Sequence, residues 1–309
     1  MHSTVFARLL AHCGSAMRAA LLVLLCAHPA SAQKSEADGA ALLRERFAAW
    51  RARADGNPFG PQLFLQSSES ERRLQGDVYA LIDHPHQTVR SALSRAGAWC
   101  DILILHLNVK YCRATTGSPE MLDVSIGRKF DQPLADAYAL RFAFNTTSSG
   151  DDYLQVQLTA PTGPLGTHDY VIQTEVAPLD DGRSVLHMKY GYAYDTGARW
   201  AMQTYLATVA RDKVGFTVMG KRASGEPQLV GGVRGVVERN AMRYYLAVTA
   251  YLGTRGLPAQ QQQAQSLRDW FAATERHALQ LHEMDLDAYL AMKASEIRRQ
   301  QTQPPTGRP

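Results

Sequence analysis

Hydrophobic and polar residues alternate in short runs between residues 107 and 195, and clusters of Gly, Pro, Asn, Asp and Ser separate the runs. A period of two is typical of β-strands that bury one face. The runs follow one another without intervening helical segments, so we expect an antiparallel meander rather than βαβ units. With an earlier run of the same kind, the pattern predicts about seven strands, at 74–83, 107–113, 121–127, 139–145, 153–160, 169–176 and 185–195.

In four of these strands the large hydrophobic residues share one parity, and therefore one face of the sheet. They are Leu122, Val124, Ile126, Leu140, Phe142, Phe144, Leu154, Val156, Leu158, Leu186, Met188, Tyr190, Tyr192 and Tyr194. Polar residues such as Asp123, Arg141 and Lys189 have the opposite parity. A sheet of this kind is expected to face water on its back and to cover its apolar front with other elements.

Helical periodicity marks the segments that could provide this cover. It is found at 36–54, 87–98, 199–213, 233–251 and 267–299. The first of these has Leu42, Phe47 and Trp50 at helical spacing and should lie on the domain. Between the third and the fourth, residues 216–231 predict a two-stranded ribbon with its tip at 222–227.

The first 32 residues have the features of a secretory signal peptide. Arg8 and Arg18 precede a short apolar run at 19–27, and Ala30-Ser31-Ala32 is a small-x-small cleavage site. The run is far shorter than the roughly 20 residues that a membrane-spanning helix needs, and no later stretch is apolar enough. We therefore expect a secreted protein with no transmembrane segment once the signal is removed. The features of the signal favour the periplasm as its location.

Cys100 and Cys112 are the cysteine pair that remains after removal of the signal. In an exported chain the default expectation is a disulfide. The alternative is two separately buried thiols, because spacing alone does not bring the Cα atoms together. No metal site is expected, since two cysteines without a C-x-x-C lack a sufficient ligand set.

Charge and motifs exclude several classes of function. The chain has 33 Lys and Arg against 29 Asp and Glu, a formal charge of +4. This balance does not favour nucleic acid as a partner. No phosphate loop, G-x-G-x-x-G or G-x-S-x-G is present, so no cofactor is expected.

Residues 78–102, VYALIDHPHQTVRSALSRAGAWCDI, combine a strand, a Pro-containing turn, a helix and a Trp. Followed by a meander and a long helix, this order resembles the START-like (SRPBCC, helix-grip or polyketide-cyclase-like) superfamily from residue 74 to about residue 253. The resemblance implies an α+β fold in which a curved antiparallel sheet wraps on a long helix. It also implies an apolar cavity between them that holds a lipid, sterol or polyketide-like ligand in most members, and no catalytic residue common to all.

The chain departs from that pattern in the insertion at 216–231 and in the helices at both ends, which leaves open which helix is gripped. We divide it into a signal peptide (1–32), an N-terminal amphipathic helix (33–60), a START-like domain (61–256), C-terminal helices (257–300) and a disordered tail (301–309).

The first functional hypothesis is binding or transfer of a hydrophobic, lipid-like ligand, which would imply transient contact with a membrane or membrane protein. The expected lining consists of Leu122, Val124, Ile126, Phe142, Phe144, Val156, Leu158, Tyr190, Tyr192, Val237, Ala241 and Tyr244. The tyrosines on one strand face suggest an amphipathic pocket, because buried hydroxyls need partners. The alternative is that these rings pack on the helix and reach water at its edge.

Other readings of the same residues stay open. A cyclase or dehydratase would use His106 with Asp101, or a tyrosine, as acid and base; otherwise His106 is a structural histidine. Lys129, with Arg128, could hold an anionic head group at the cavity mouth or could be a solvated hairpin end. His84 and His86 read as turn residues rather than metal ligands. Finally, the sheet could have a solid core and scaffold other proteins through its terminal helices.

Overall fold

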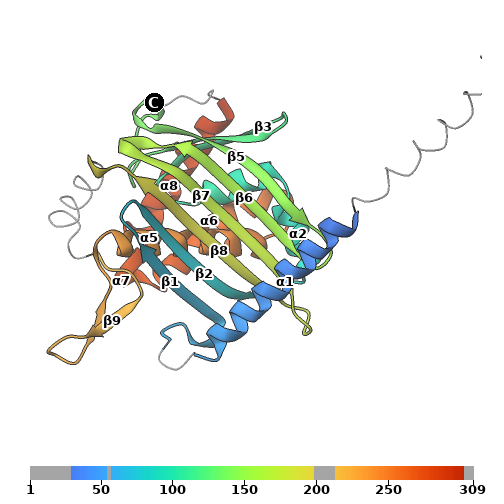
Figure 1. Ribbon diagram of the computed structural model, residues 1–309. Helices are drawn as coiled ribbons and strands as arrows, with labels where there is room; N and C mark the ends of the chain where they lie inside the picture. Colours follow the sequence, from blue (N-terminus) through green and yellow to red (C-terminus); the bar gives the residue numbers. More distant parts are fainter. Residues whose placement is uncertain (1–28, 54–56, 198–212, 303–309) are drawn as a thin grey trace, which may run out of the picture.

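The computed structural model describes residues 29–53, 57–197 and 213–302 (Figure 1). Its main feature is one antiparallel sheet of eight strands in the described part of the chain, in the order β1-β2-β8-β7-β6-β5-β4-β3. The strands are β1 (Leu63–Glu69), β2 (Arg73–Ile82), β3 (Val109–Thr115), β4 (Glu120–Ile126), β5 (Tyr138–Ser149), β6 (Leu154–Thr162), β7 (Thr167–Pro178) and β8 (Ser184–Tyr194).

The strand register confirms the predicted parity. Val124 lies opposite Leu140, Leu158 lies opposite Ile172, and Ile172 lies opposite Tyr190. Because directly paired residues point to the same face, their side chains form a continuous apolar surface across the middle of the sheet.

The long helix α5 (Gly232–Gly253) packs on this surface and contacts β1, β2 and β8. Gly76 of β2 allows the close approach, because a Cβ atom there would lie 3.0 Å from the Cβ of Ala241 and 3.1 Å from the carbonyl oxygen of Val237. The α+β, helix-grip architecture implied by the START-like resemblance is therefore confirmed, and α5 is the gripped helix. It has eight strands rather than about seven.

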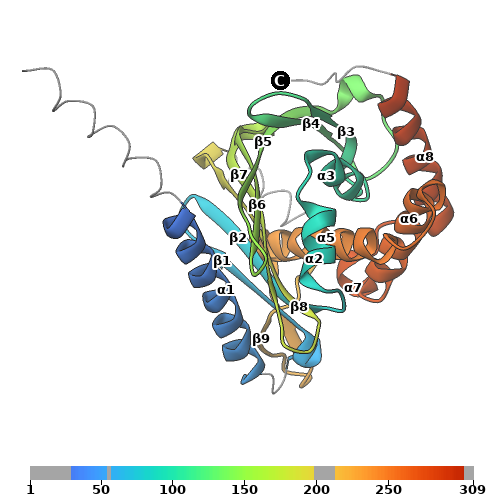
Figure 2. The same ribbon diagram turned by 90° about the vertical axis from the view of Figure 1, so that its right-hand side faces the viewer.

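The helices α2 (His86–Leu93), α3 (Ala96–Leu103), α6 (Ala259–Glu275), α7 (Ala278–Leu281) and α8 (Leu286–Thr302) lie on the same side of the sheet as α5 (Figure 2). Trp270 of α6 and Tyr289 of α8 belong to the same hydrophobic core as the sheet. Short 3-10 turns occur at Gly60–Gln62, Leu134–Asp136 and Pro164–Gly166. Within the described ranges, no helix combines the length and the hydrophobicity that crossing a bilayer requires.

Several predicted boundaries change. The strand that the pattern missed is β1, in which only Leu63, Phe64 and Leu65 are hydrophobic before a polar run. The ribbon at 216–231 is confirmed as β9 (Val218–Lys221) and β10 (Pro227–Leu229). The helix predicted at 199–213 falls almost entirely on 198–212, outside the described residues, as do most of the predicted signal peptide and residues 303–309 of the tail. Helix α8 extends into the first residues of that tail.

The sequence suggested that the back of the sheet faces water, and this prediction is wrong. Helix α1 (Pro29–Arg51) lies across the back of the sheet (Figures 1 and 2). A second hydrophobic cluster forms there: Ala40, Leu43, Phe47, Phe64, Tyr79, Tyr153, Ala177 and Val185. Leu42, which we expected on the buried face, is instead 45% exposed. The helix is rotated so that Leu43 and Phe47 face the sheet.

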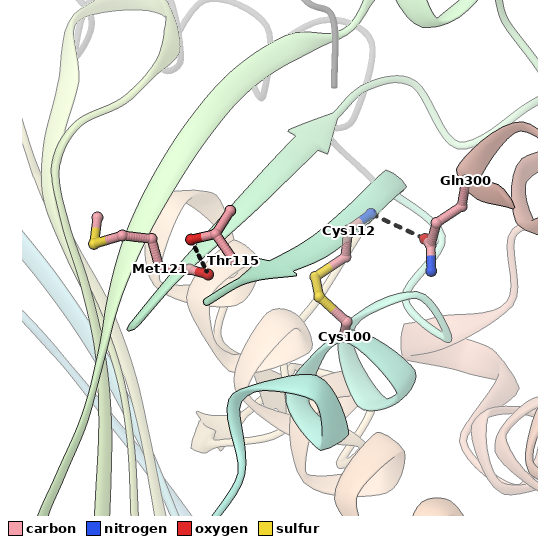
Figure 3. Close-up of a disulfide and its surroundings, with 5 residues drawn as sticks. All are labelled: Cys100, Cys112, Thr115, Met121 and Gln300. Atoms are coloured by element: carbon pink, nitrogen blue, oxygen red, sulfur yellow. Dashed lines mark hydrogen bonds between the residues drawn. A yellow bond between two sulfur atoms is a disulfide. The ribbon is translucent and has the colours of Figure 1, made fainter. Parts of the chain in front are cut away.

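Cys100 of α3 and Cys112 of β3 form the expected disulfide, with their Cα atoms 5.1 Å apart (Figure 3). The backbone N–H of Cys112 also donates a 3.0 Å hydrogen bond to Oε1 of Gln300 in α8. The bridge therefore ties the edge strand to the helical layer.

Replacing both cysteines by serine should lower the free energy of unfolding by about 3 kcal/mol, because the cross-link removes loop-closure entropy from the unfolded chain. Urea unfolding of the oxidised protein and of the C100S/C112S variant measures the difference. Adding a thiol reductant should then leave the variant unchanged, and equal stability of the two oxidised proteins would contradict the expectation.

Candidate functional site

The predicted lining residues come together on the concave face. Ten of them are buried in the same core as α5: Leu122, Val124, Phe142, Phe144, Val156, Leu158, Tyr190, Tyr192, Val237 and Ala241. Ile126 and Tyr244 pack against that core and keep part of their surface accessible. Their assembly on one face agrees with the sequence pattern, and their role as a ligand lining stays a prediction.

A continuous run of aromatic rings crosses this face. The centroid distances are 6.4 Å from Phe142 to Tyr170, 5.2 Å from Tyr170 to Tyr192 and 5.9 Å from Tyr192 to Tyr190. The run continues to Tyr244 of α5, whose ring centroid lies 5.1 Å from that of Tyr190. The rings thus join the sheet to the helix.

Tyr170 was not predicted as a site residue, although it shares the parity of Ile172 and Val176 on β7. Its hydroxyl lies 2.8 Å from Oγ1 of Thr167. That parity is the signal from which the sequence could have placed it.

The buried phenols of the run stay neutral. Burial raises the pKa of Tyr190 well above its usual value, and it also raises the pKa of Tyr192 and Tyr244. The amide of Asn240, one helical turn before Tyr244, lies beside both the Tyr190 hydroxyl and the His106 ring. Neutral phenols and an amide can donate and accept hydrogen bonds, but such phenols are poor bases at physiological pH.

His106 lies at the end of this run. The residue is 2% exposed, and its ring stacks on that of Tyr244 at a centroid distance of 4.8 Å. Burial lowers its pKa well below the usual value, and the positive charges of Arg243 and Lys293 lower it further. The imidazole is therefore neutral.

The tautomer of His106 follows from the hydrogen bond at its Nδ1. Nδ1 accepts from the backbone N–H of Asn108 at 3.1 Å, so the proton of the neutral ring is on Nε2. That Nε2–H is buried, and no acceptor meets it with hydrogen-bond geometry, although the Asn240 amide lies near the ring. An unsatisfied buried donor costs about 1–3 kcal/mol and needs an explanation, such as a polar guest.

A basic cluster adjoins His106. Nη2 of Arg243 on α5 donates to Oε1 of Glu283 at 2.9 Å and to the carbonyl of Leu281 at 3.2 Å. Lys129 and Lys213 also pair with Glu283. Arg243 is 2% exposed, and its Nε is a second buried donor without a partner.

The electrostatics of this cluster favour a negative charge. Burial and the nearby Arg243 lower the pKa of Lys129 to about 8, against the opposing effect of Glu283. Burial alone would raise the pKa of Glu283, but Arg243 and Lys129 outweigh it and the pKa is lowered. One ionised carboxylate therefore faces three cationic groups.

Of the two basic residues considered from the sequence, the structure brings only Lys129 to the site. The Arg128 side chain lies over the ring of exposed Phe130, 5.6 Å from its centroid. Arg243, Asn240 and Glu283 were missed. The available signal was an arginine at position 243 in a helix whose neighbouring positions are mostly apolar.

Asp101 is not placed to act with His106, which corrects the proposed acid and base pair. Asp101 is exposed on α3, where it lines an open surface depression of about 660 Å³ beside the disulfide. Its charged neighbours are Arg255 and Arg95. His106 instead faces the core, because its ring stacks on Tyr244.

The remaining histidine pair does not form a metal site with other ligands. His86 is buried at the start of α2, whereas His84 is partly exposed in the preceding turn. Nε2 of His86 also lacks a partner, and burial followed by the charge of Arg90 lowers its pKa. Across 29–53, 57–197 and 213–302, no group of three or more His, Cys, Asp or Glu residues is arranged to hold a metal ion.

Comparison with protein-family models and with curated proteins finds no match. Among solved structures, norcoclaurine synthase from Thalictrum flavum aligns at 12% identity over 46% of this chain and 91% of that chain, with a TM-score of 0.33. Human StAR-related lipid transfer protein 5 aligns at 10% identity over 52% and 83%, with a TM-score of 0.29. A conserved protein of unknown function from Enterococcus faecalis aligns at 9% identity over 76% and 91%, with a TM-score of 0.28. At these TM-scores the similarities say nothing about ligand or activity.

Proposed function

We propose that this protein binds a hydrophobic, lipid-like molecule between the concave face of the sheet and α5. The observation that carries the proposal is the run of rings from Phe142 to Tyr244, which ends on the unpartnered Nε2–H of His106. An entirely apolar core offers no acceptor to a buried donor at that point, whereas a bound molecule with a polar end would accept its hydrogen bond.

The partial accessibility of α5 residues inside this layer supports the same proposal. Tyr244 is enclosed by the rings of His106 and Tyr190, yet part of its surface is accessible, and so is part of Asn240. No hydrogen bond joins the Tyr244 hydroxyl to another of the described residues. Apolar walls with a few convergent polar groups are typical of small-molecule sites.

Binding of this kind needs no catalytic group. A guest that buried on the order of 400 Å² of apolar surface would gain roughly 10 kcal/mol before association costs are subtracted. The disulfide supports action in an oxidising compartment, and we propose export to the periplasm or beyond on that basis together with the predicted signal.

The test is direct ligand detection. Native mass spectrometry of the purified full chain should show a co-purifying lipid, and the delipidated protein should bind the neutral apolar fluorophore N-phenyl-1-naphthylamine. Leu158→Trp, which adds bulk on the concave face, should weaken fluorophore binding at least tenfold. Leu279→Trp is the matched control, because Leu279 is 69% exposed on α7.

Thermal unfolding of each variant establishes that it is folded. If Leu158→Trp does not fold, Phe144→Trp replaces it, because this substitution adds less volume. The proposal fails if the wild-type protein carries no lipid and binds no fluorophore. It also fails if Leu279→Trp weakens binding as much as the concave-face variants do.

A further inference from the structure

The cluster of Arg243, Lys129, Lys213 and Glu283 is incompletely neutralised. Glu283 is the carboxylate to which all three cationic side chains are paired, so the group carries a formal excess of two positive charges. The Arg243 guanidinium is 2% exposed, and the Glu283 side chain is 11% exposed. The Lys129 and Lys213 side chains are 36% and 37% exposed, so water screens their charges. The buried Arg243 has to share its carboxylate with both of them, and a further negative partner would lower the cost of its burial.

Two unpartnered donors mark where that partner would lie. The Nε–H of Arg243 and the Nε2–H of His106 have no acceptor, and both residues are more than nine-tenths buried. Arg243 is also among the charges that act on the His106 ring. A carboxylate or phosphate oxygen accepts several hydrogen bonds at once, which matches two N–H groups next to an ammonium.

The position of the cluster connects it to the aromatic run. The charges of Arg243 and Lys129 act on the His106 ring, and that ring stacks on Tyr244 at the end of the run. A molecule that extends along the rings from Tyr170 would therefore bring one end to the basic cluster. Lys129, with a side chain 36% exposed, places the cluster at the border between the core and solvent.

We infer that the bound molecule is an amphiphile with an acidic head group, a carboxylate or a phosphate, held by Arg243, Lys129 and the Nε2–H of His106, with its tail along the tyrosines. This inference rests on the proposed function and adds the chemical class of the ligand to it. The structure favours an anion over a neutral sterol or alcohol head, because a neutral group would leave the excess positive charge uncompensated.

The experiment compares ligands with the same tail. Delipidated full-length protein is titrated with oleate and with oleyl alcohol, and binding is followed by displacement of N-phenyl-1-naphthylamine. Oleate should bind at least tenfold more tightly than oleyl alcohol. Oleoyl lysophosphatidate and inorganic phosphate form two further arms, which separate a carboxylate from a phosphate head and a tailed ligand from a free anion.

Matched arginine variants then locate the head group. Arg243→Met should lower oleate affinity at least tenfold and leave oleyl alcohol binding within about twofold. Arg255→Met is the control, because Arg255 follows the same helix but lies over the Tyr251 ring, 3.8 Å from its centroid. Lys129→Met, at a partly exposed position, replaces Arg243→Met if the latter does not fold.

The outcomes separate the two proposals. Equal affinity for oleate and oleyl alcohol would overturn the anionic head group while leaving hydrophobic binding intact. Binding of inorganic phosphate that matches that of lysophosphatidate would also overturn it, because the tail would then contribute nothing. If neither tailed ligand binds and no lipid co-purifies, the proposed function itself fails.

Discussion

Glu296→Gln should lower the free energy of unfolding by about 3–5 kcal/mol, which is the cost of removing one partner from a buried ion pair. Glu296 of α8 is fully buried and accepts hydrogen bonds of 2.8 Å from both Lys110 on β3 and Lys293 on α8. Both ammonium groups also donate to backbone carbonyls, Lys110 to that of Leu107 and Lys293 to that of His106. Without the carboxylate, two buried cations would remain with neutral acceptors only.

Urea unfolding at pH 6 measures this loss, and Glu120→Gln on an exposed position of β4 is the control, with an expected change of about 0.5 kcal/mol or less.

Burial already lowers the pKa of Lys293 to about 8, against the opposing charge of Glu296. In the variant this lysine can release its proton, so stability should partly recover as the pH rises from 6 to 9, where the unfolded state binds more protons. A loss below 1 kcal/mol at pH 6 would show that the triad contributes little.

His187→Gln is the second substitution with a large expected effect, again about 3–5 kcal/mol at pH 7. His187 lies on the back of the sheet beneath α1, with Nε2 2.8 Å from Oδ1 of Asp77 and Nδ1 2.6 Å from Oε2 of Glu175. Tyr79 stacks on its ring at 4.2 Å, and Tyr153 donates to Glu175. Removing the imidazolium would leave two carboxylates facing each other under a helix.

The pH dependence of this network has a definite sign. Burial lowers the pKa of His187, but its hydrogen bonds to Asp77 and Glu175 outweigh burial, and the net pKa is raised. Its contribution to stability is therefore complete below the usual value of about 6.5 and is lost as the pH rises through the raised pKa. Burial raises the pKa of Glu175, but hydrogen bonds from His187 and Tyr153 lower it to about 2. That contribution is present above the usual value of 4.5 and is lost as the pH falls towards 2.

The difference between wild type and His187→Gln should consequently shrink between pH 4.5 and pH 2, because the wild type loses the stabilising contribution of ionised Glu175 over this range. Denaturant unfolding at pH 3, 5 and 7 tests this. His168→Gln is a close control, because His168 also lies between two carboxylates, Asp169 and Asp195, but its side chain is 36% exposed. It should lose no more than about 1 kcal/mol. A pH-independent loss in His187→Gln would indicate a packing defect instead.

The sheet was predictable because its determinants are local. Alternation along Leu122, Val124 and Ile126, or along Tyr190 and Tyr192, reflects the period of a single strand and needs no knowledge of its neighbours. The ribbon at 216–231 and the disulfide between Cys100 and Cys112 were predictable for similar reasons, from turn residues and from the cysteine count. Strand β1 escaped because a short edge strand with three hydrophobic residues has too little alternation to detect.

The candidate site was only half predictable. The apolar and tyrosine residues carry a periodic signal, but the polar groups do not. Arg243 and Glu283 are far apart in sequence and meet through the arrangement of α5 and the turn before α8. The interpretation of His106 with Asp101 failed because nearness in sequence at the end of a short helix does not fix the direction in which each side chain points.

The sequence by itself determined seven of the eight strands and the apolar face, because hydrophobic periodicity is a property of each segment taken alone. It left open which helix covers that face, and the structure identifies α5. Only the tertiary structure decided that α1 closes the back of the sheet, that Glu296 neutralises two buried lysines and that the aromatic run ends at a basic cluster. Burial and charge compensation depend on which distant segments meet, and no local pattern encodes that meeting.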